Sequence, residues 1–267
     1  MPEAEVRRAL LPVAGKGTRM HPVTTAVPKE LLPIGTRPLI EFALDEARDA
    51  GLRELVLVTA RGKSAIEDFV DDWSARQRHP LAVSYVRQRE QRGLGHAVLV
   101  AAHLLEGAPF AVMLPDDLLP GPPLALRDLA ATHRRTGRAA VLLQSIRPAD
   151  SASYGVPSLR RGVGPDIVID DLVEKPAPAQ APSRFGVVGR YVLPASILGR
   201  LEAVAPGAGG EIQLTDALAA LARDETIVGV ALRQPRLDCG SPAGYLAAQS
   251  IVGGARPATR RAEERVA

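Results

Sequence analysis

Aromatic residues are scarce in this chain of 267 residues, since Phe, Trp and Tyr together make up 3%. A surface that stacks bases on aromatic rings is therefore not expected, and neither is a nucleic-acid partner. Cysteine occurs once, as Cys239. A disulfide framework and a cysteine-based metal site within one chain are both excluded, which fits a reducing cytoplasm.

Long apolar runs are also missing. No stretch approaches the roughly 18 uninterrupted apolar residues of a membrane-spanning helix, and the N-terminal apolar run is too short for a signal peptide. The chain is expected to be soluble and cytoplasmic, with no membrane partner. Its charge is nearly balanced, with 33 Lys and Arg against 30 Asp and Glu. The chain has 267 residues, of which 46% are hydrophobic, and this is enough to form the core of one large domain.

Lysine is rare among the 33 basic residues, most of which are arginine. The four lysines are Lys16, Lys29, Lys63 and Lys175. Lysine that persists can mark a place that needs a compact ammonium rather than a planar guanidinium. The alternative that these four are remnants of a coding bias stays open. Lys63 lies in a turn and is expected to tolerate arginine.

Strand and helix patterns alternate in the first half of the chain. Buried apolar strands that alternate with amphipathic helices are typical of a doubly wound, mostly parallel α/β sheet of the Rossmann-like kind. Strands are predicted over 10–14, 55–59, 81–87 and 110–114, and helices over 38–50, 64–75 and 96–105.

The second half has a different pattern, with irregular Pro/Gly stretches between the elements. Its strands are expected to extend the same sheet and form a lobe rather than a tandem domain. Strands are predicted over 139–145, 167–173, 187–193 and 227–232, and helices over 125–135, 194–203, 212–222 and 242–251. One domain is predicted over 8–252, and a flexible basic tail over 253–267.

The loop AGKGTRM follows the first predicted strand. A dinucleotide fingerprint needs a third glycine where His21 and Pro22 stand, and an acid at the end of the second strand, which is absent. A P-loop needs a different spacing. What remains is a glycine loop whose backbone amides can approach phosphate, with Lys16 and Arg19 adding positive charge.

Further motifs follow in a fixed order between residues 10 and 251. They are GKGTRM, PKELLP, RQREQRGLGHAV, LPDD, YGV, VEKP, VGRYVL, GEIQLTDAL and DCGSPAGY. In this order the chain resembles the sugar-1-phosphate nucleotidyltransferases, and within them the members that use UTP and glucose 1-phosphate.

The resemblance implies attack of the sugar phosphate on the α-phosphorus of UTP, which gives UDP-glucose and pyrophosphate with the help of Mg²⁺. Another sugar 1-phosphate, dTTP as the nucleotide, or a non-catalytic paralogue that binds nucleotide sugar are the alternatives. Residues 8–120 would mainly hold the nucleotide, and residues 121–252 mainly the sugar.

The resemblance also assigns the site. Catalytic roles are implied for Arg19, Lys29, Asp116 and Lys175, and Mg²⁺ would be held by Asp116 and Asp238. Substrate binding is implied for Ala14, Gly15, Gly17, Thr18, Gln88, Gly93, Gly155, Glu174 and Gly189. His96 is interpreted as a packing residue at the start of a helix.

Four positions depart from the family pattern. Asp117 replaces an apolar residue and is expected to be a solvated carboxylate. Arg184 and Gly186 border the implied sugar site, so the identity of the sugar stays open. Gly210 lies where the family makes subunit contacts. A homodimer or homotetramer is expected, although the departure leaves the choice open.

Overall fold

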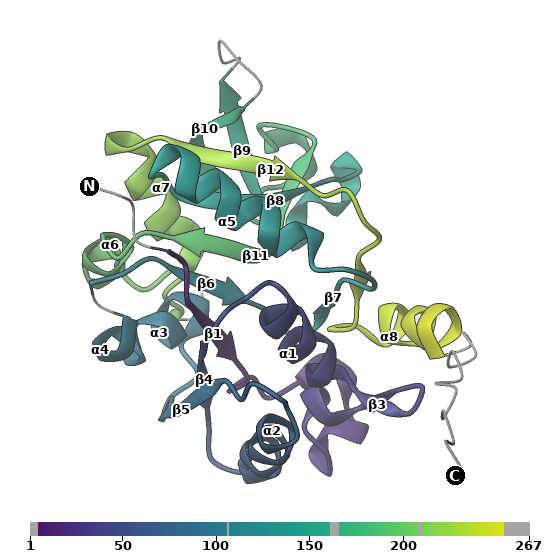
Figure 1. The fold of residues 1–267 in the computed structure, drawn as a ribbon. Coiled ribbons are helices and arrows are strands. Elements are labelled where there is room, and N and C mark those ends of the chain that lie inside the picture. The colour runs from purple at the N-terminus through teal and green to yellow at the C-terminus, as the bar shows by residue number, and fades with distance from the viewer. Residues whose placement is uncertain (1–4, 106, 161–165, 208–209, 254–267) are drawn as a thin grey trace, which may run out of the picture.

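The computed structural model describes residues 5–105, 107–160, 166–207 and 210–253. The basic tail predicted for the end of the chain lies outside these residues beyond Gly253. One nine-stranded sheet runs through the described chain, in the order β5-β4-β1-β6-β11-β8-β12-β10-β9 (Figure 1). The division into a nucleotide half and a sugar half stays a prediction.

The first half forms the parallel side of the sheet. The strands β5, β4, β1 and β6 are parallel neighbours, as the alternating pattern predicted. The elements are β1 (Arg8–Pro12), α1 (Leu39–Asp49), β4 (Glu54–Thr59), α2 (Ser64–Ala75), β5 (Ala82–Arg87), α3 (Gly93–Val100), α4 (Ala102–Leu105) and β6 (Phe110–Met113). The helix predicted over 96–105 begins earlier and is divided in two.

The second half adds strands to the same sheet, as predicted. Their pairings are mainly antiparallel, so the mostly parallel arrangement holds for the first half. The strand β11 is antiparallel to both β6 and β8, whereas β12 is parallel to β8 and antiparallel to β10. The elements are α5 (Leu124–Thr136), β8 (Ala140–Ser145), β9 (Gly155–Arg160), β10 (Ile167–Glu174), β11 (Phe185–Leu193), α6 (Ile197–Ala203), α7 (Leu214–Asp224), β12 (Ile227–Ala231) and α8 (Pro242–Ala248).

The sequence patterns did not predict β9. This strand begins at Gly155 and contains Pro157, two residues that weaken a strand pattern. Proline is tolerated there because β9 is the edge strand and pairs with β10 only. The last predicted helix also ends earlier, because α8 passes into a π-helical turn, η7 (Gln249–Gly253).

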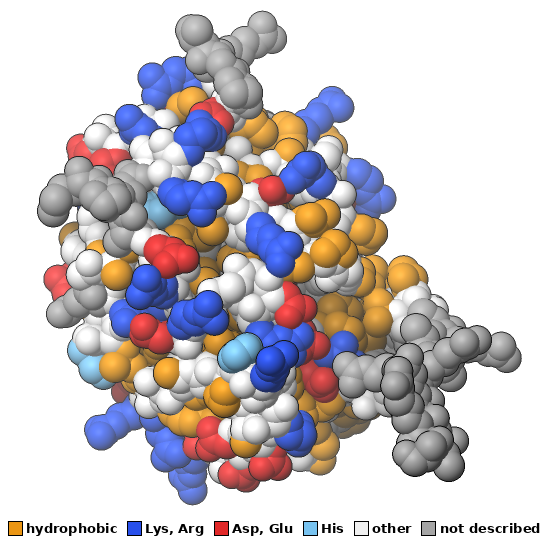
Figure 2. All heavy atoms as spheres, viewed as in Figure 1, with side chains coloured by type: hydrophobic (Ala, Val, Ile, Leu, Met, Phe, Trp, Pro, Cys, Tyr) orange, Lys and Arg blue, Asp and Glu red, His pale blue; other side chains and the backbone are white. Residues whose placement is uncertain are grey.

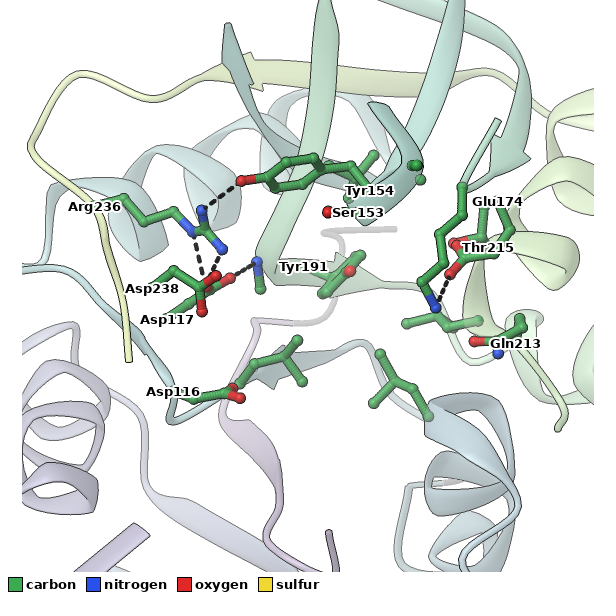
Figure 3. A pocket seen from close by; sticks show the side chains of 18 of the residues that line it. Asp116, Asp117, Ser153, Tyr154, Glu174, Tyr191, Gln213, Thr215, Arg236 and Asp238 are labelled. Atoms are coloured by element: carbon green, nitrogen blue, oxygen red, sulfur yellow. Dashed lines mark hydrogen bonds and ion pairs between the residues drawn. The ribbon is translucent and has the colours of Figure 1, made fainter. Parts of the chain in front are cut away.

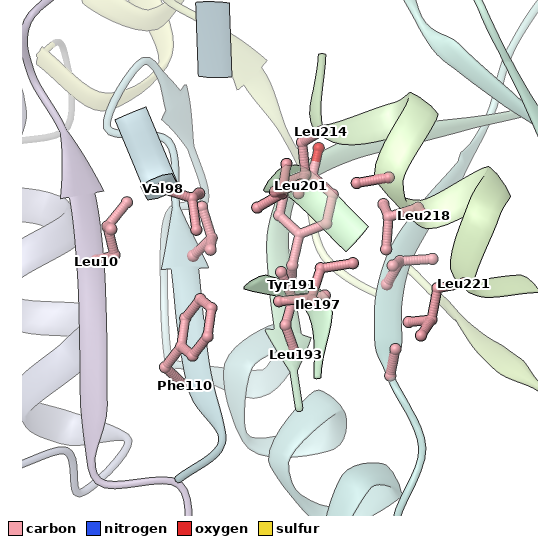
Figure 4. Packing of buried hydrophobic residues seen from close by; sticks show 14 of the residues in the cluster. Leu10, Val98, Phe110, Tyr191, Leu193, Ile197, Leu201, Leu214, Leu218 and Leu221 are labelled. Atoms are coloured by element: carbon pink, nitrogen blue, oxygen red, sulfur yellow. The ribbon is translucent and has the colours of Figure 1, made fainter. Parts of the chain in front are cut away.

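Side chains of the strands alternate between two apolar layers. On β1, Leu10 joins one buried cluster, whereas Ala9 and Leu11 join the other. Figure 4 shows the first layer, where Leu10 and Phe110 of the sheet lie close to Val98 of α3. Helices α3, α6 and α7 cover this face, and α1, α2 and α5 cover the opposite one.

Basic and acidic side chains are interspersed on the face seen in Figure 2, in keeping with the balanced charge of the chain. Within the described ranges, the helices are too short or too polar to cross a membrane.

Candidate active site

Two cavities meet at the carboxyl end of β6. The larger has a volume of about 800 Å³ and the smaller about 420 Å³. Asp116 lines both, together with Leu94 and Leu114. Ligands of open α/β sheets bind at the carboxyl ends of the parallel strands. The segments that follow β1, β5 and β6 all contribute to the smaller cavity.

Asp116 and Asp238 are brought together by a short antiparallel ladder. In this ladder β7 (Asp117–Leu118) pairs with β13 (Leu237–Asp238), and the Cys239 amide donates to the carbonyl of Asp116 over 2.8 Å. A Cβ placed on Gly240 would lie 2.8 Å from Asp116 Oδ2 and 3.1 Å from Asp238 Oδ1. The two carboxylates therefore converge on one point, although they are more than 100 residues apart in the chain.

Arg19 reaches the same point from the glycine loop, because its Nη2 would lie 2.9 Å from that Cβ. Across the described residues, no group of three or more His, Cys, Asp or Glu side chains could hold a metal ion. Two carboxylates fit a hard cation that completes its coordination with substrate phosphate oxygens and water. The donor set of Asp116 and Asp238 is thus suited to Mg²⁺.

Lys29 faces Asp116 from the short 3₁₀ turn η3 (Lys29–Leu31), with its Nζ 2.6 Å from Oδ2. Burial disfavours both charges, but each group offsets this for the other. The pKa of Asp116 is therefore lowered and that of Lys29 is raised. Both side chains stay ionised at neutral pH, which places a fixed ammonium beside the carboxylates.

The glycine loop forms one wall of the smaller cavity, which Ala14, Gly15 and Thr18 line. Gly17 lies outside the lining of both cavities. Its φ of 66° is left-handed, and its carbonyl accepts a 2.8 Å hydrogen bond from Thr24 Oγ1. Gly17 thus shapes the loop, whereas its neighbours face the cavity.

Gln88 and Gly93 lie on another wall of the smaller cavity. Gly93 has a left-handed φ of 92°, and a Cβ there would lie 2.7 Å from the carbonyl oxygen of Ile212. Backbone hydrogen bonds join Ile212 to Arg92 and Gly95, each at 2.8 Å. The segment before α7 is therefore bound directly to the start of α3, and this contact requires glycine at position 93.

Glu174 and Lys175 close the far end of the larger cavity, which is drawn in Figure 3. Their side chains are paired, with Lys175 Nζ 3.1 Å from Glu174 Oε1. Thr215 Oγ1 donates to the other oxygen of Glu174 over 2.6 Å. Lys175 has a φ of 47°, a strained value for a side chain other than glycine, and such strain is concentrated at functional sites.

The expectation that Asp117 is solvated is wrong. Its side chain is buried, Arg236 Nε donates to it over 2.7 Å, and the amide of Gly189 donates over 2.6 Å. Arg236 also bonds Tyr154 Oη at 3.2 Å. An unpaired carboxylate at this depth would be costly, so Arg236 makes the departure from an apolar residue possible. Gly189 lines the larger cavity, but its amide is engaged by Asp117.

Arg190 secures the segment that carries Asp116. It is 1% exposed, and its guanidinium donates to Glu46 at 2.7 Å, to the Leu114 carbonyl at 2.8 Å and to the Asp117 carbonyl at 3.0 Å. The backbone is thus held on both sides of Asp116. This contact joins α1, β11 and the end of β6.

Arg184 is exposed and does not line the larger cavity. A residue larger than glycine at position 186 would clash with Tyr154, because a Cβ there would lie 2.8 Å from Tyr154 Cγ. Tyr154 and Arg236 therefore line the larger cavity, whereas the Arg184 side chain does not.

The sequence alone indicates no partner for Lys63. Its Nζ lies 2.8 Å from Glu30 Oε2, and the pair is almost fully buried. Glu30 directly follows Lys29, so this ion pair fastens the turn after β4 to the segment that holds the site lysine. Thr215, Arg236, Arg190 and Glu30 each contact a distant segment of the chain. Glu30, Arg190 and Thr215 lie within the motifs PKELLP, VGRYVL and GEIQLTDAL, but no local pattern in the sequence indicates their partners.

Comparisons with known proteins identify the family and the fold. The family described as nucleotidyl transferase matches residues 8–253 of the chain. The UTP–glucose-1-phosphate uridylyltransferase YngB of Bacillus subtilis is 39% identical, over 96% of this chain and 92% of that protein. A structure of UDP-glucose pyrophosphorylase complexed with UDP-glucose superposes with a TM-score of 0.88 at 35% identity. It covers 94% of this chain and 100% of that one. The UTP-bound enzyme from Acinetobacter baumannii has a TM-score of 0.82 at 33% identity, over 95% of both chains.

Proposed function

The chain belongs to the nucleotidyl transferase family, and on that premise we propose that it transfers a uridylyl group from UTP to glucose 1-phosphate. One observation carries the proposal. Two cavities meet at Asp116, where Lys29 lies 2.6 Å away and Asp238 and Arg19 converge. Such a junction suits a reaction between two phosphate-bearing substrates. Similar proteins are named for UTP, glucose 1-phosphate and UDP-glucose.

The smaller cavity would hold UTP, with the triphosphate along the glycine loop and the base near Gln88 and Gly93. The larger cavity would hold glucose 1-phosphate. Residues 8–120 would then serve mainly the nucleotide and residues 121–252 mainly the sugar.

The reaction needs no nucleophile from the protein, because the substrate phosphate supplies one. A phosphate oxygen of glucose 1-phosphate forms a bond to the α-phosphorus of UTP. The bond from that phosphorus to the bridging oxygen breaks, and pyrophosphate leaves with the electron pair. The contribution of the protein is alignment and neutralisation of charge.

Each charged residue has a place in that scheme. Lys29 and Arg19 would neutralise charge on the nucleotide phosphates, and Lys175 would hold the sugar phosphate. Glu174, oriented by Thr215, would accept hydrogen bonds from sugar hydroxyls. A bound Mg²⁺, held by Asp116 and Asp238, would neutralise phosphate oxygens as a Lewis acid.

A matrix of nucleoside triphosphates against sugar 1-phosphates tests the function, with pyrophosphate release as the readout. The highest kcat/KM is expected for UTP with glucose 1-phosphate in the presence of Mg²⁺, and a chelator should abolish release. A better rate with dTTP or with another sugar 1-phosphate would replace the substrate assignment. Tight UDP-glucose binding without release from any pair would point to the non-catalytic alternative.

The single cysteine supports a cytoplasmic location for the enzyme. The expected homodimer or homotetramer stays a prediction. Light scattering coupled to size-exclusion chromatography distinguishes these two states from a monomer.

A further inference from the structure

The Gln88 side chain is the polar group placed deepest in the wall of the smaller cavity, with 3% of the residue exposed. It follows β5, and its backbone amide donates to the Thr59 carbonyl over 2.8 Å. The backbone of Gln88 is therefore fixed to the sheet. The remaining question is which end of its amide faces the cavity.

Two neighbours answer that question. Gln88 Nε2 lies 3.3 Å from the carbonyl oxygen of Gly93 and 2.8 Å from His96 Nδ1. A carbonyl oxygen can only accept, so the end of the amide that faces Gly93 must be the NH₂ group. The second hydrogen of that group then points at His96, whose Nδ1 must be the acceptor.

His96 is therefore neutral, with its ring proton on Nε2. Its surroundings agree with this state, because burial and the nearby Arg92 lower the pKa of His96. With both amide hydrogens engaged, the Gln88 amide oxygen is left to a ligand. No protein partner for this oxygen occurs in the described ranges. The Gln88 side chain therefore presents a hydrogen-bond acceptor, and no donor, to the cavity.

We propose that His96 is a positioning residue that turns the Gln88 amide oxygen toward the nucleotide base, and so selects uracil over cytosine. Uracil carries an N–H at position 3, which donates to an amide oxygen. In cytosine the nitrogen at position 3 carries no hydrogen and is itself an acceptor, so it would repel the amide oxygen of Gln88. This inference rests on the proposed function, because it takes the base of a nucleoside triphosphate as the ligand.

Three variants test the role of His96. His96→Phe keeps a ring without an acceptor, His96→Ala removes the ring, and His96→Gln restores an acceptor through its amide oxygen. The UTP/CTP ratio of kcat/KM is expected to fall about fivefold in the Phe and Ala variants, as for one lost hydrogen bond. The loss should lie in KM for UTP rather than in kcat, and His96→Gln should recover most of it.

The dTTP reaction separates selection from general damage. Thymine carries the same N–H as uracil, so the UTP/dTTP ratio should not change in any variant. Calorimetric titration with UTP and with CTP gives the same comparison without turnover. His103→Phe, at an exposed position of α4, is the matched control.

An unchanged UTP/CTP ratio in both His96→Phe and His96→Ala would overturn the inference. Equal losses for UTP, CTP and dTTP would also overturn it, because they would show a merely structural role. Failure of the wild-type chain to release pyrophosphate from UTP would instead refute the proposed function. The two failures are therefore distinguishable.

Discussion

Lys29 Nζ and Asp116 Oδ2 lie 2.6 Å apart, although the two residues come from the loop after β1 and the loop after β6. The pair joins the smaller cavity to the point where Asp238 and Arg19 also converge. In this structure the ammonium satisfies a carboxylate that would also serve a metal ion. Charge at this junction is therefore shared between the lysine, the carboxylates and any bound cation.

Asp116→Asn preserves the shape of the side chain and removes its charge. We expect a loss of at least a hundredfold in kcat, or roughly 3 kcal/mol of transition-state stabilisation, because the anion opposite Mg²⁺ disappears. Steady-state pyrophosphate release over a range of Mg²⁺ concentrations measures the effect. Asp68→Asn, at an exposed position of α2, is the control. A variant with near wild-type turnover at limiting Mg²⁺ would refute the metal assignment.

Thr215→Val tests how Glu174 is oriented. The change is nearly isosteric but removes the 2.6 Å hydrogen bond from Oγ1 to the carboxylate. We expect kcat/KM for glucose 1-phosphate to fall about tenfold, or about 1.4 kcal/mol, while KM for UTP stays constant. Thr136→Val is the matched control, since its hydroxyl bonds the Thr132 carbonyl on α5, away from both cavities. An equal rise in both KM values would show that the effect is not specific to the sugar.

Local patterns predicted most of the fold because strand and helix periodicity are local properties of a sequence. They missed β9, whose Gly155 and Pro157 weaken a strand pattern although the edge of a sheet tolerates both. They also missed the burial of Asp117. Its partner Arg236 is more than 100 residues away, and only the β7–β13 ladder brings the two together.

The predicted site residues other than Gly17 line the two cavities for a similar reason. Motifs name residues that lie at the ends of strands, and the sheet brings those ends together. Their supporting contacts are not predictable in this way. The sequence favours a packing role for His96, because a histidine near a helix start has no partner that a local pattern indicates. Its contact with Gln88 depends on the distance between β5 and α3.

Stability should depend on pH through His96. Burial is the largest cause of its lowered pKa, and Arg92 lowers it further against a smaller opposing effect of Glu90. In the unfolded chain the imidazole of His96 is protonated as the pH falls through about 6.5, whereas in the folded chain it is protonated only at lower pH. The stability of the wild type relative to His96→Gln should be constant above that value and decrease as pH falls through it. Urea unfolding from pH 8 to pH 5 measures this difference, and an increase at low pH would contradict the assignment.

Lys63→Met should be strongly destabilising, because it leaves the Glu30 carboxylate buried without its ammonium partner. Breaking a buried ion pair costs about 3–5 kcal/mol. The double variant Lys63→Met with Glu30→Leu should recover much of that loss, since no unpaired charge remains. Urea unfolding of both variants gives the coupling energy. Lys16→Met, at an exposed position, is the control. Losses that simply add would show that the pair contributes no coupling.

Replacing the site lysines by arginine tests whether the compact ammonium matters. Lys29 contacts Asp116 in a mostly buried pair, whereas Lys175 contacts Glu174 with about half of its side chain exposed at the larger cavity. Arginine keeps the charge but is longer and planar. A displacement of about 1 Å in a reacting complex can cost roughly a hundredfold. We therefore expect Lys29→Arg and Lys175→Arg each to lose at least tenfold in kcat/KM, with melting temperatures near wild type. The exposed Lys16→Arg should have a mild effect. Equal behaviour of all three variants in steady-state kinetics would show that charge alone suffices at these positions.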